Sequence, residues 1–223
     1  VKFENLVVYE EGYGTYNFAP VVINWKTKPK QFLIKLFGFN GNIGQSKLNN
    51  QVFVYYPSLY KNINGENKTI NVFFKSFIEN LKDNLPLFSK IYGGLGSIEN
   101  ISNKTVFLYI TTWEVEEKII TILSKKKNEA DFVFIKPHPH IANNIEFSDF
   151  QKIDLTIPVE FIVVQLLLNN NNVSVIHQNS SAMIYLKGVK NLEVTNYTGL
   201  NKELDLIYSG IYQKIPLNKL TNI

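Results

Sequence analysis

The sequence predicts an α/β fold whose second half forms a doubly wound, mostly parallel sheet. Three short runs rich in β-branched and aromatic residues, at positions 105–111, 132–136 and 173–177, have the length and composition of buried strands. Two longer runs between them, at 116–127 and 158–168, carry apolar residues at helical spacing. Strands that alternate with helices along a chain form parallel sheets, and this order predicts the fold class.

The first half of the chain predicts fewer regular elements. Residues 5–9 predict a buried strand that ends at Glu10. Residues 52–56 predict a second strand, which Pro57 ends. Residues 70–84 carry apolar side chains at roughly helical spacing, so a helix is predicted there.

Two domains are predicted, with the division near residue 103. Pro86 and a glycine-rich stretch at 93–96 interrupt the helical pattern and predict a linker over residues 90–104. Residues 1–103 would then form an N-terminal domain with the linker, and residues 104–223 a Rossmann-like C-terminal domain. Because a strand is predicted within the first nine residues, the N-terminal domain is expected to be incomplete.

The composition excludes several classes of site. The 223 residues contain no cysteine, which rules out disulfide frameworks, thiolate zinc sites and cysteine nucleophiles. All 23 basic residues are lysine, and the net charge is +4. Because arginine is the preferred side chain for bidentate contacts to phosphates and bases, its absence disfavours a nucleic-acid partner. A basic surface still suits an anionic ligand or peripheral contact with an anionic membrane.

Ligands of doubly wound sheets bind beyond the carboxyl ends of the strands. In this chain the residues at those positions include most of the side chains that could bind a ligand or transfer a proton. They are the acidic pair with glycine at 10–12, residues 112–116, the histidine segment 137–139, and residues 179–181.

A histidine held between prolines follows the strand 132–136. Two of the three histidines lie in the segment Lys136-Pro137-His138-Pro139-His140. Prolines on both sides of His138 restrict its backbone, and an imidazole can protonate a leaving phosphate or act as a general base near neutral pH. The alternative is a surface turn in which the histidines have no chemical role.

Carboxylates at two strand ends are candidates for a general base. Glu10, Glu11 and Gly12 place adjacent carboxylates before a turn, where like-charge repulsion raises the pKa of one of them. Glu114 and Glu116 follow the strand 105–111 in the same way. A solvated strand end or helix start explains either group equally well.

Ser180 and Ser181 follow the strand 173–177, and residues 182–186 are predicted to continue as a helix. Backbone N–H groups and two hydroxyls at a helix start suit a phosphate, although serines there also serve as ordinary N-caps. Glu160, in the first turn of the helix after Pro158, could accept hydrogen bonds from ribose hydroxyls. Acidic residues are also common at that position without any ligand.

The order and strand-end placement of these motifs resemble bacterial sialyltransferases, specifically the lipooligosaccharide sialyltransferases of glycosyltransferase family 52, and the related polysialyltransferases. The resemblance is strongest over residues 106–186. It implies a GT-B-type fold with two Rossmann-like domains, of which the N-terminal one faces the acceptor. It also implies inverting transfer of sialic acid from CMP-sialic acid, without a metal or another cofactor.

The same resemblance assigns roles to individual residues. His138 matches the general acid at the leaving phosphate, Ser180 and Ser181 match a phosphate-binding pair, and Glu160 matches a ribose-binding glutamate. The flanking Lys136 and Pro139 are expected to help bind the donor, as are Glu10 and Gly12 at the acidic motif. In related families the acidic motif supplies the general base, which would be Glu11 or Glu10 here. In the lipooligosaccharide sialyltransferases an acidic residue about one strand–helix unit before the histidine has that role, which would be Glu116 or Glu114.

The expected acceptor is a galactose-type hydroxyl of a bacterial surface glycan. The enzyme would work in the cytoplasm at the inner face of the membrane, and the resemblance also allows a homodimer. Alternative functions are transfer of a CDP-glycerol-type group in capsule or teichoic-acid assembly, polysialic acid synthesis, CMP binding without catalysis, or a purely structural α/β domain.

Overall fold

The structure is a computed structural model, and the description below covers residues 7–10, 13–16, 50–64, 69–73, 75–93, 95–112, 117–138, 150–154, 156–197 and 202–214. Its contacts divide the chain into two compact units. The first comprises residues 1–76 and 203–215, and the second comprises residues 77–202 and 216–223. The boundary between the units therefore lies at 76/77, whereas the sequence places the domain division at 103/104. The roles assigned to the two domains stay a prediction.

The first unit contains a three-stranded parallel sheet in the order β1-β2-β3, formed by Val7–Tyr9, Gln51–Val54 and Thr69–Val72. Val52 and Val54 of the central strand are fully buried. The helices α1 (Tyr13–Tyr16) and α3 (Pro57–Asn64) follow β1 and β2. The helix α8 (Lys202–Lys214), which the sequence analysis did not predict, returns almost entirely to this unit.

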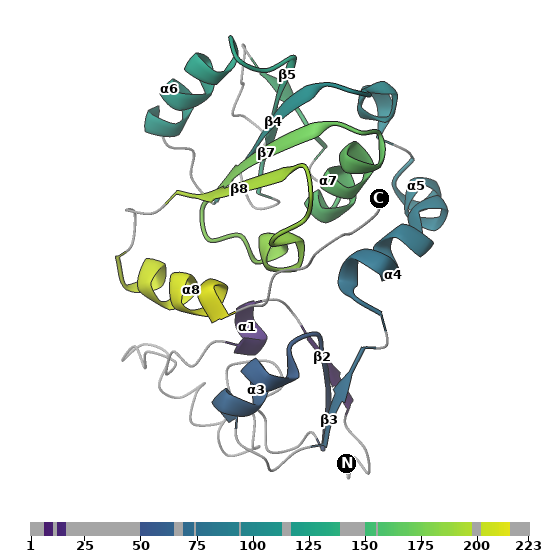
Figure 1. The fold of residues 1–223 in the computed structure, drawn as a ribbon, viewed down its shortest axis with the longest axis vertical. Coiled ribbons are helices and arrows are strands. Elements are labelled where there is room, and N and C mark those ends of the chain that lie inside the picture. Colours follow the sequence, from purple (N-terminus) through teal and green to yellow (C-terminus); the bar gives the residue numbers. More distant parts are fainter. Residues whose placement is uncertain are drawn as a thin grey trace, which may run out of the picture. The chain divides into compact units, whose positions relative to one another are not determined.

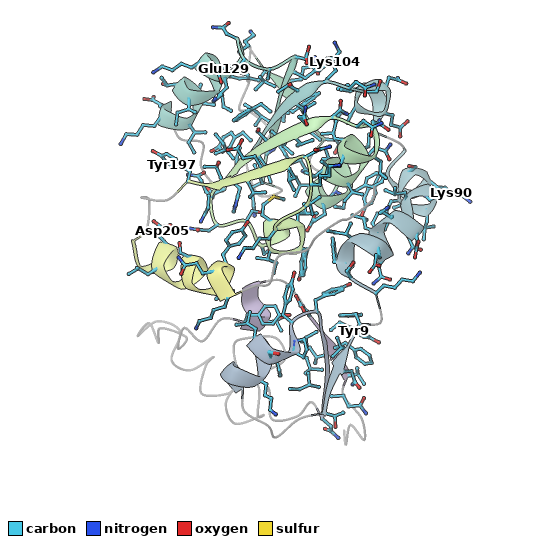
Figure 2. All side chains as sticks on the ribbon, viewed as in Figure 1. Tyr9, Lys90, Lys104, Glu129, Tyr197 and Asp205 are labelled. Carbon is cyan, nitrogen blue, oxygen red and sulfur yellow. The ribbon has the colours of Figure 1, made fainter. Side chains whose placement is uncertain are left out.

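Two predictions for this unit need correction. Among the described strands of this sheet β1 lies at the edge, and it is not buried, since Tyr9, labelled in Figure 2, is 61% exposed. The predicted helix over residues 70–84 is wrong in its first part, where β3 pairs with β2 in parallel. Only Phe77–Asp83 is helical, as α4. The apolar spacing that suggested one helix thus joins residues of two different units.

The second unit is built on a five-stranded parallel sheet in the order β6-β5-β4-β7-β8. Its predicted strands are β4 (Thr105–Ile110), β5 (Phe132–Lys136) and β7 (Asn172–His177). The sequence did not indicate the two outer strands, β6 (Gln151–Lys152) and β8 (Leu192–Asn196). Successive strands are added on one side of β4 up to β6, and then on its other side from β7, so the sheet is doubly wound.

Helices cover both faces of this sheet, as Figure 1 shows for α6 and α7. The helix α7 (Val159–Leu168) is apolar on every side and is buried in the larger cluster, with Val106, Leu108 and Val175 of the sheet. The helix α6 (Glu117–Lys126) packs Ile119 and Leu123 against the opposite face. Packing of these helices stabilises the sheet because it removes apolar surface from water.

The predicted linker over residues 90–104 is not a linker between the units, because both of its ends lie inside the second unit. It contains the end of α5 (Leu85–Tyr92) and a short 3₁₀ helix, η2 (Gly96–Asn100). Pro86 does not break α5, since it occupies the first turn, where no intrahelical N–H is needed. Gly93 ends the helix in the left-handed conformation, at φ +72°.

Candidate functional site

Three strands of the second unit end at the same level of the sheet. In the parallel register Ile110 of β4 pairs with Lys136 of β5 on one side and with His177 of β7 on the other. The strand order changes direction between β4 and β7. A crevice forms at such a switch point because the connections from the neighbouring strands lead away to opposite faces of the sheet. Figure 2 shows the two edges: Lys104 marks the amino end of β4, and Tyr197 follows the carboxyl end of β8.

A cavity of about 470 Å³ occupies this switch point. It is lined by the ends of β4, β5 and β7 and by the segment that leads into α7. The lining residues are Ile110, Thr111, Thr112, Lys136, Pro137, His138, Thr156, Ile157, Pro158, Val159, Gln178, Asn179, Ser180 and Ser181. Among these described residues there are one lysine, one histidine, several hydroxyls and two amides, but no carboxylate. The lining therefore suits an anionic ligand.

The half-buried His138 is fixed to the end of the neighbouring strand. Its backbone N–H donates to Oγ1 of the buried Thr111 at 2.9 Å. The N–H of Thr111 donates in turn to the carbonyl of Lys136 at 3.1 Å, so the β4–β5 ladder continues one step beyond the strands. The ring of Pro137 fixes its own φ, so the backbone that leads into His138 is restricted as well. The imidazole thus stands on a rigid support at the cavity wall.

Lys136 is the buried cation of the cavity, with an exposed fraction of 5%. Burial lowers the pKa of its ammonium group, and the negative charges of Asp154 and Glu160 oppose that shift. Burial raises the pKa of Glu160, while its own backbone N–H and the charge of Lys136 lower it. The charges of these two carboxylates let Lys136 keep its positive charge more readily than burial alone would allow.

The segment that enters α7 is shaped by a local turn. Asp154 accepts hydrogen bonds from the N–H and the hydroxyl of Thr156, at 2.8 and 2.7 Å. These bonds lower the pKa of Asp154, with a smaller contribution from Lys136. Pro158 then precedes the first turn of α7 without any side-chain cap. The N-terminal backbone of α7 therefore borders the cavity beside Lys136.

The loop after β7 is tied to the edge strand β8. Asn179 adopts the left-handed conformation at φ +53°, which asparagine tolerates better than most residues. The backbone N–H of Asn179 donates to Oδ1 of Asn196 at 2.8 Å, and Nδ2 of Asn196 donates to Oδ1 of Asn179 at 2.9 Å. This pair of bonds fixes the loop that carries Ser180 into the cavity wall.

The predicted helix start at the serine pair is only partly correct. Ser181–Leu186 form a six-residue 3₁₀ helix, η3, rather than an α-helix. Ser180 occupies the N-cap position, yet its side chain makes no capping hydrogen bond. The ordinary capping explanation for this serine therefore fails. So short a helix also carries too small a dipole to bind a phosphate by itself.

His177, the third histidine of the chain, is fully buried at the end of β7. Its Nδ1 accepts a hydrogen bond from the N–H of Ser180 at 3.0 Å, so the neutral ring carries its proton on Nε2. Burial lowers the pKa of His177 from 6.5 to about 4. The neutral imidazole thereby holds the serine loop in place.

We expect His177 to make the protein less stable in acid. The unfolded chain binds a proton at its usual pKa near 6.5, whereas the folded chain binds it only near 4. The free energy of unfolding should be unaffected above pH 6.5 and should fall by about 3 kcal/mol as the pH drops from 6.5 to 4. His177→Asn keeps an acceptor for Ser180 and removes the titration. Urea denaturation of both proteins at pH 7 and pH 4.5 measures the difference, and equal pH dependence in the two would contradict this role.

The cavity brings together four of the residues predicted from the sequence, Lys136, His138, Ser180 and Ser181. Glu160 lies one residue beyond the lining residue Val159 and acts on Lys136 through its charge. The predicted residues Glu11, Gly12, Glu116 and Pro139 lie outside the described residues, as does Glu114. Their assignments stay predictions.

Glu10 belongs to the first unit, where its carboxylate has bonds of its own. Oε2 accepts a hydrogen bond from the hydroxyl of the buried Tyr16 and another from the N–H of Tyr55 at 2.6 Å. The Tyr16 hydroxyl also accepts from the N–H of Tyr56 at 3.1 Å. These bonds join the ends of β1 and β2 to α1, so Glu10 has a structural role at this strand end. Its predicted contact with a substrate stays a prediction.

Some residues of the site were not singled out from the sequence. Thr111 supports His138, Gln178 lines the cavity, and Asn196 holds the serine loop. Asn196 is the last residue of β8, a strand of five residues that the sequence did not indicate. The one available signal was position, since Thr111 is the last residue of the predicted strand 105–111 and Gln178 directly follows the predicted strand 173–177.

Within the part of the chain that is described, no group of three or more histidine and carboxylate side chains is arranged to bind a metal ion. Nor does any described helix have the length and apolar character needed to cross a membrane.

Comparisons with known proteins find similarity only at the level of the fold. No family model matches the sequence, and no curated protein matches it. Among solved structures, one described as the wall teichoic acid polymerase TagF is similar to this chain, with a TM-score of 0.52 and 17% sequence identity. The likeness covers 96% of this chain and 63% of the TagF chain. None of the comparisons supports the resemblance to sialyltransferases. The chain thus has an α/β fold with parallel sheets of the GT-B type, as the sequence predicts.

Proposed function

We propose that this protein is a glycosyltransferase that moves a group from a nucleotide-activated donor, bound by its phosphate in the cavity of the second unit. The observation that carries the proposal is the cavity lining. A buried lysine, a histidine on a rigid support and the serine loop meet at the switch point of the sheet. The absence of carboxylates from the described lining favours a phosphate over a cationic ligand.

The donor we propose is CMP-sialic acid, on the strength of the motif resemblance. The acceptor hydroxyl oxygen attacks the anomeric carbon of the sugar as the bond from that carbon to the phosphate oxygen breaks. The bonding electrons stay on the phosphate, where His138 supplies a proton or a hydrogen bond to the leaving oxygen. A carboxylate removes the proton of the acceptor hydroxyl. Lys136 and the serine loop stabilise the negative charge that develops on the phosphate.

The carboxylate base is proposed among the residues named from the sequence. Glu11 and Glu116 are the two principal candidates. Glu10 is the weaker candidate at the acidic motif, because its carboxylate already accepts hydrogen bonds from Tyr16 and Tyr55.

The likeness to TagF favours a second candidate function. In that case the cavity would bind a CDP-linked glycerol phosphate donor and the chain would take part in assembling a teichoic-acid-type polymer. Both candidates require a cytidine nucleotide at the cavity, and they differ in the group that is transferred.

A panel of ligands should identify the donor. CMP-sialic acid, CMP, CDP-glycerol, a UDP-sugar and a GDP-sugar are added separately to the protein, and its thermal unfolding is measured. A ligand present at 100 times its dissociation constant should stabilise the protein by about 2.7 kcal/mol, because it binds the folded state alone. We expect CMP and CMP-sialic acid to raise the midpoint and the UDP- and GDP-sugars to leave it unchanged.

The control is the double variant Ser180→Ala/Ser181→Ala, which should lose most of the stabilisation by CMP. Stabilisation by CDP-glycerol but not by CMP-sialic acid would favour the second candidate. Stabilisation by a UDP- or GDP-sugar alone would contradict both.

A further inference from the structure

Two buried donors at the end of β7 have no hydrogen-bond partner among the described residues, the Nε2 atoms of His177 and Gln178. Folded proteins leave very few buried polar groups unpaired, because each one costs the free energy of its lost hydration. Such a group therefore requires an explanation, of which a ligand is one. The two donors lie on consecutive residues where the sheet meets the cavity, and only Gln178 belongs to the cavity lining.

The side chain of Gln178 is fixed from one end. It is 4% exposed, and its Oε1 accepts a hydrogen bond from the hydroxyl of Tyr109 at 3.0 Å. Tyr109 is itself fully buried, within the cluster that includes Ile119 and Leu123 of α6. A tyrosine hydroxyl that donates to the carbonyl oxygen leaves the NH₂ group of the amide as the end without a partner.

We infer that Gln178 is a ligand-binding residue of this cavity and that its Nε2 donates to a phosphate oxygen of the bound nucleotide. Tyr109 is the residue that positions its amide. Nε2 is covered by surrounding protein atoms, while Gln178 itself is part of the cavity wall. The inference rests on the proposed function, whose donor carries this phosphate.

Two observations and one general property of hydrogen bonds favour a phosphate oxygen over other acceptors. The buried Lys136 lines the same cavity and attracts an anion. Ser180 follows Gln178 by two residues, and both line the cavity. A phosphate bound by the serine loop would therefore lie near Gln178. A hydrogen bond to a charged oxygen is also stronger than one to a neutral carbonyl, which suits a donor that is buried at a cost.

The test compares four proteins: the wild type, Tyr109→Phe, the double variant Tyr109→Phe/Gln178→Leu, and the control Gln151→Leu, which changes an exposed glutamine of β6 outside the cavity lining. Calorimetric titration measures the binding of CMP, cytidine and inorganic phosphate to each. The double variant should bind CMP and phosphate roughly 10- to 100-fold more weakly, because it lacks one hydrogen bond to a charged group. Cytidine should bind as it does to the wild type. Tyr109→Phe alone should cause a smaller loss, and Gln151→Leu none.

Stability provides a second readout that a merely structural role would not give. The double variant replaces both partners of a buried hydrogen bond by apolar groups of similar shape and removes the unpaired donor. Its free form should therefore unfold at the same urea concentration as the wild type or at a higher one. A folded variant with wild-type affinity for CMP and phosphate would overturn the inference.

Other outcomes are equally decisive. Equal losses for CMP and cytidine would place Gln178 at the base and overturn the phosphate assignment. If the wild type binds inorganic phosphate but no nucleotide, and the double variant loses phosphate, the proposed donor fails while the role of Gln178 stands. If the wild type binds none of the three probes, both proposals are overturned.

Discussion

Replacing His138 by alanine should lower kcat by about 10²- to 10⁴-fold, the usual contribution of a general acid or base. The nucleotide should still bind, because Lys136 and the serine loop remain in the cavity. The backbone at this position should also keep its place, since the hydrogen bond from residue 138 to Thr111 is made by the backbone N–H. The effect is thus expected in the chemical step, with little change in the dissociation constant of CMP.

The measurement is single-turnover transfer from CMP-sialic acid, together with titration of CMP. The matched control is His140→Ala, which removes the other histidine of the same segment. Transfer at the wild-type rate by the His138→Ala protein would contradict the assignment of His138. Loss of CMP binding along with transfer would instead indicate that His138 binds the ground state.

Replacing Asn171 by alanine should give the largest loss of stability, about 3–5 kcal/mol, because several buried backbone groups lose their partner at once. Asn171 is fully buried before β7. Its Nδ2 donates to the carbonyls of Ile101 and Leu166, at 2.8 and 2.9 Å, and its Oδ1 accepts from the N–H of Lys104 at 2.9 Å. One side chain therefore joins the end of α7, the segment after η2 and the start of β4.

Asn169→Ala is the matched control. Asn169 makes a hydrogen bond of similar length, to the carbonyl of Glu99 at 2.9 Å, but at an exposed position. Water replaces an exposed bond of this kind, so the loss should stay below about 1 kcal/mol. Urea denaturation followed by circular dichroism measures both variants. Similar losses for the two would show that burial of the Asn171 contacts adds nothing.

The central strands of the second unit were predictable because the signal for them lies in their own short sequences. The strands β4, β5 and β7 lie in the interior of the sheet, and apolar and β-branched residues dominate their sequences. The helix α7 is apolar at eight of its ten positions, the exceptions being Glu160 and Gln165, because it is buried in the same core. The rule that ligands bind beyond such strand ends then placed Lys136, His138 and the serine pair at one edge, and the cavity lies there.

The elements that the sequence did not predict depend on contacts between distant residues. The strand β3 has only four residues and is stabilised by its pairing with β2, and the edge strand β8 by its pairing with β7. The site contacts missed are of the same kind: the bond between Tyr109 and Gln178 spans 69 residues, and those between Asn179 and Asn196 span 17. Such pairs form only once the register of the sheet is set, so no local sequence pattern predicts them.

The tie between Asn179 and Asn196 bears on how fragments of this chain can be used. Every predicted site residue lies at or before position 181, so a shortened protein ending near residue 190 would contain all of them. Such a protein would nevertheless lack the strand that anchors the serine loop. A shortened protein made to test the proposed nucleotide binding should therefore extend through Tyr197, whose N–H donates to the carbonyl of His177 at 2.7 Å. A boundary drawn from the site residues alone would cut away part of their support.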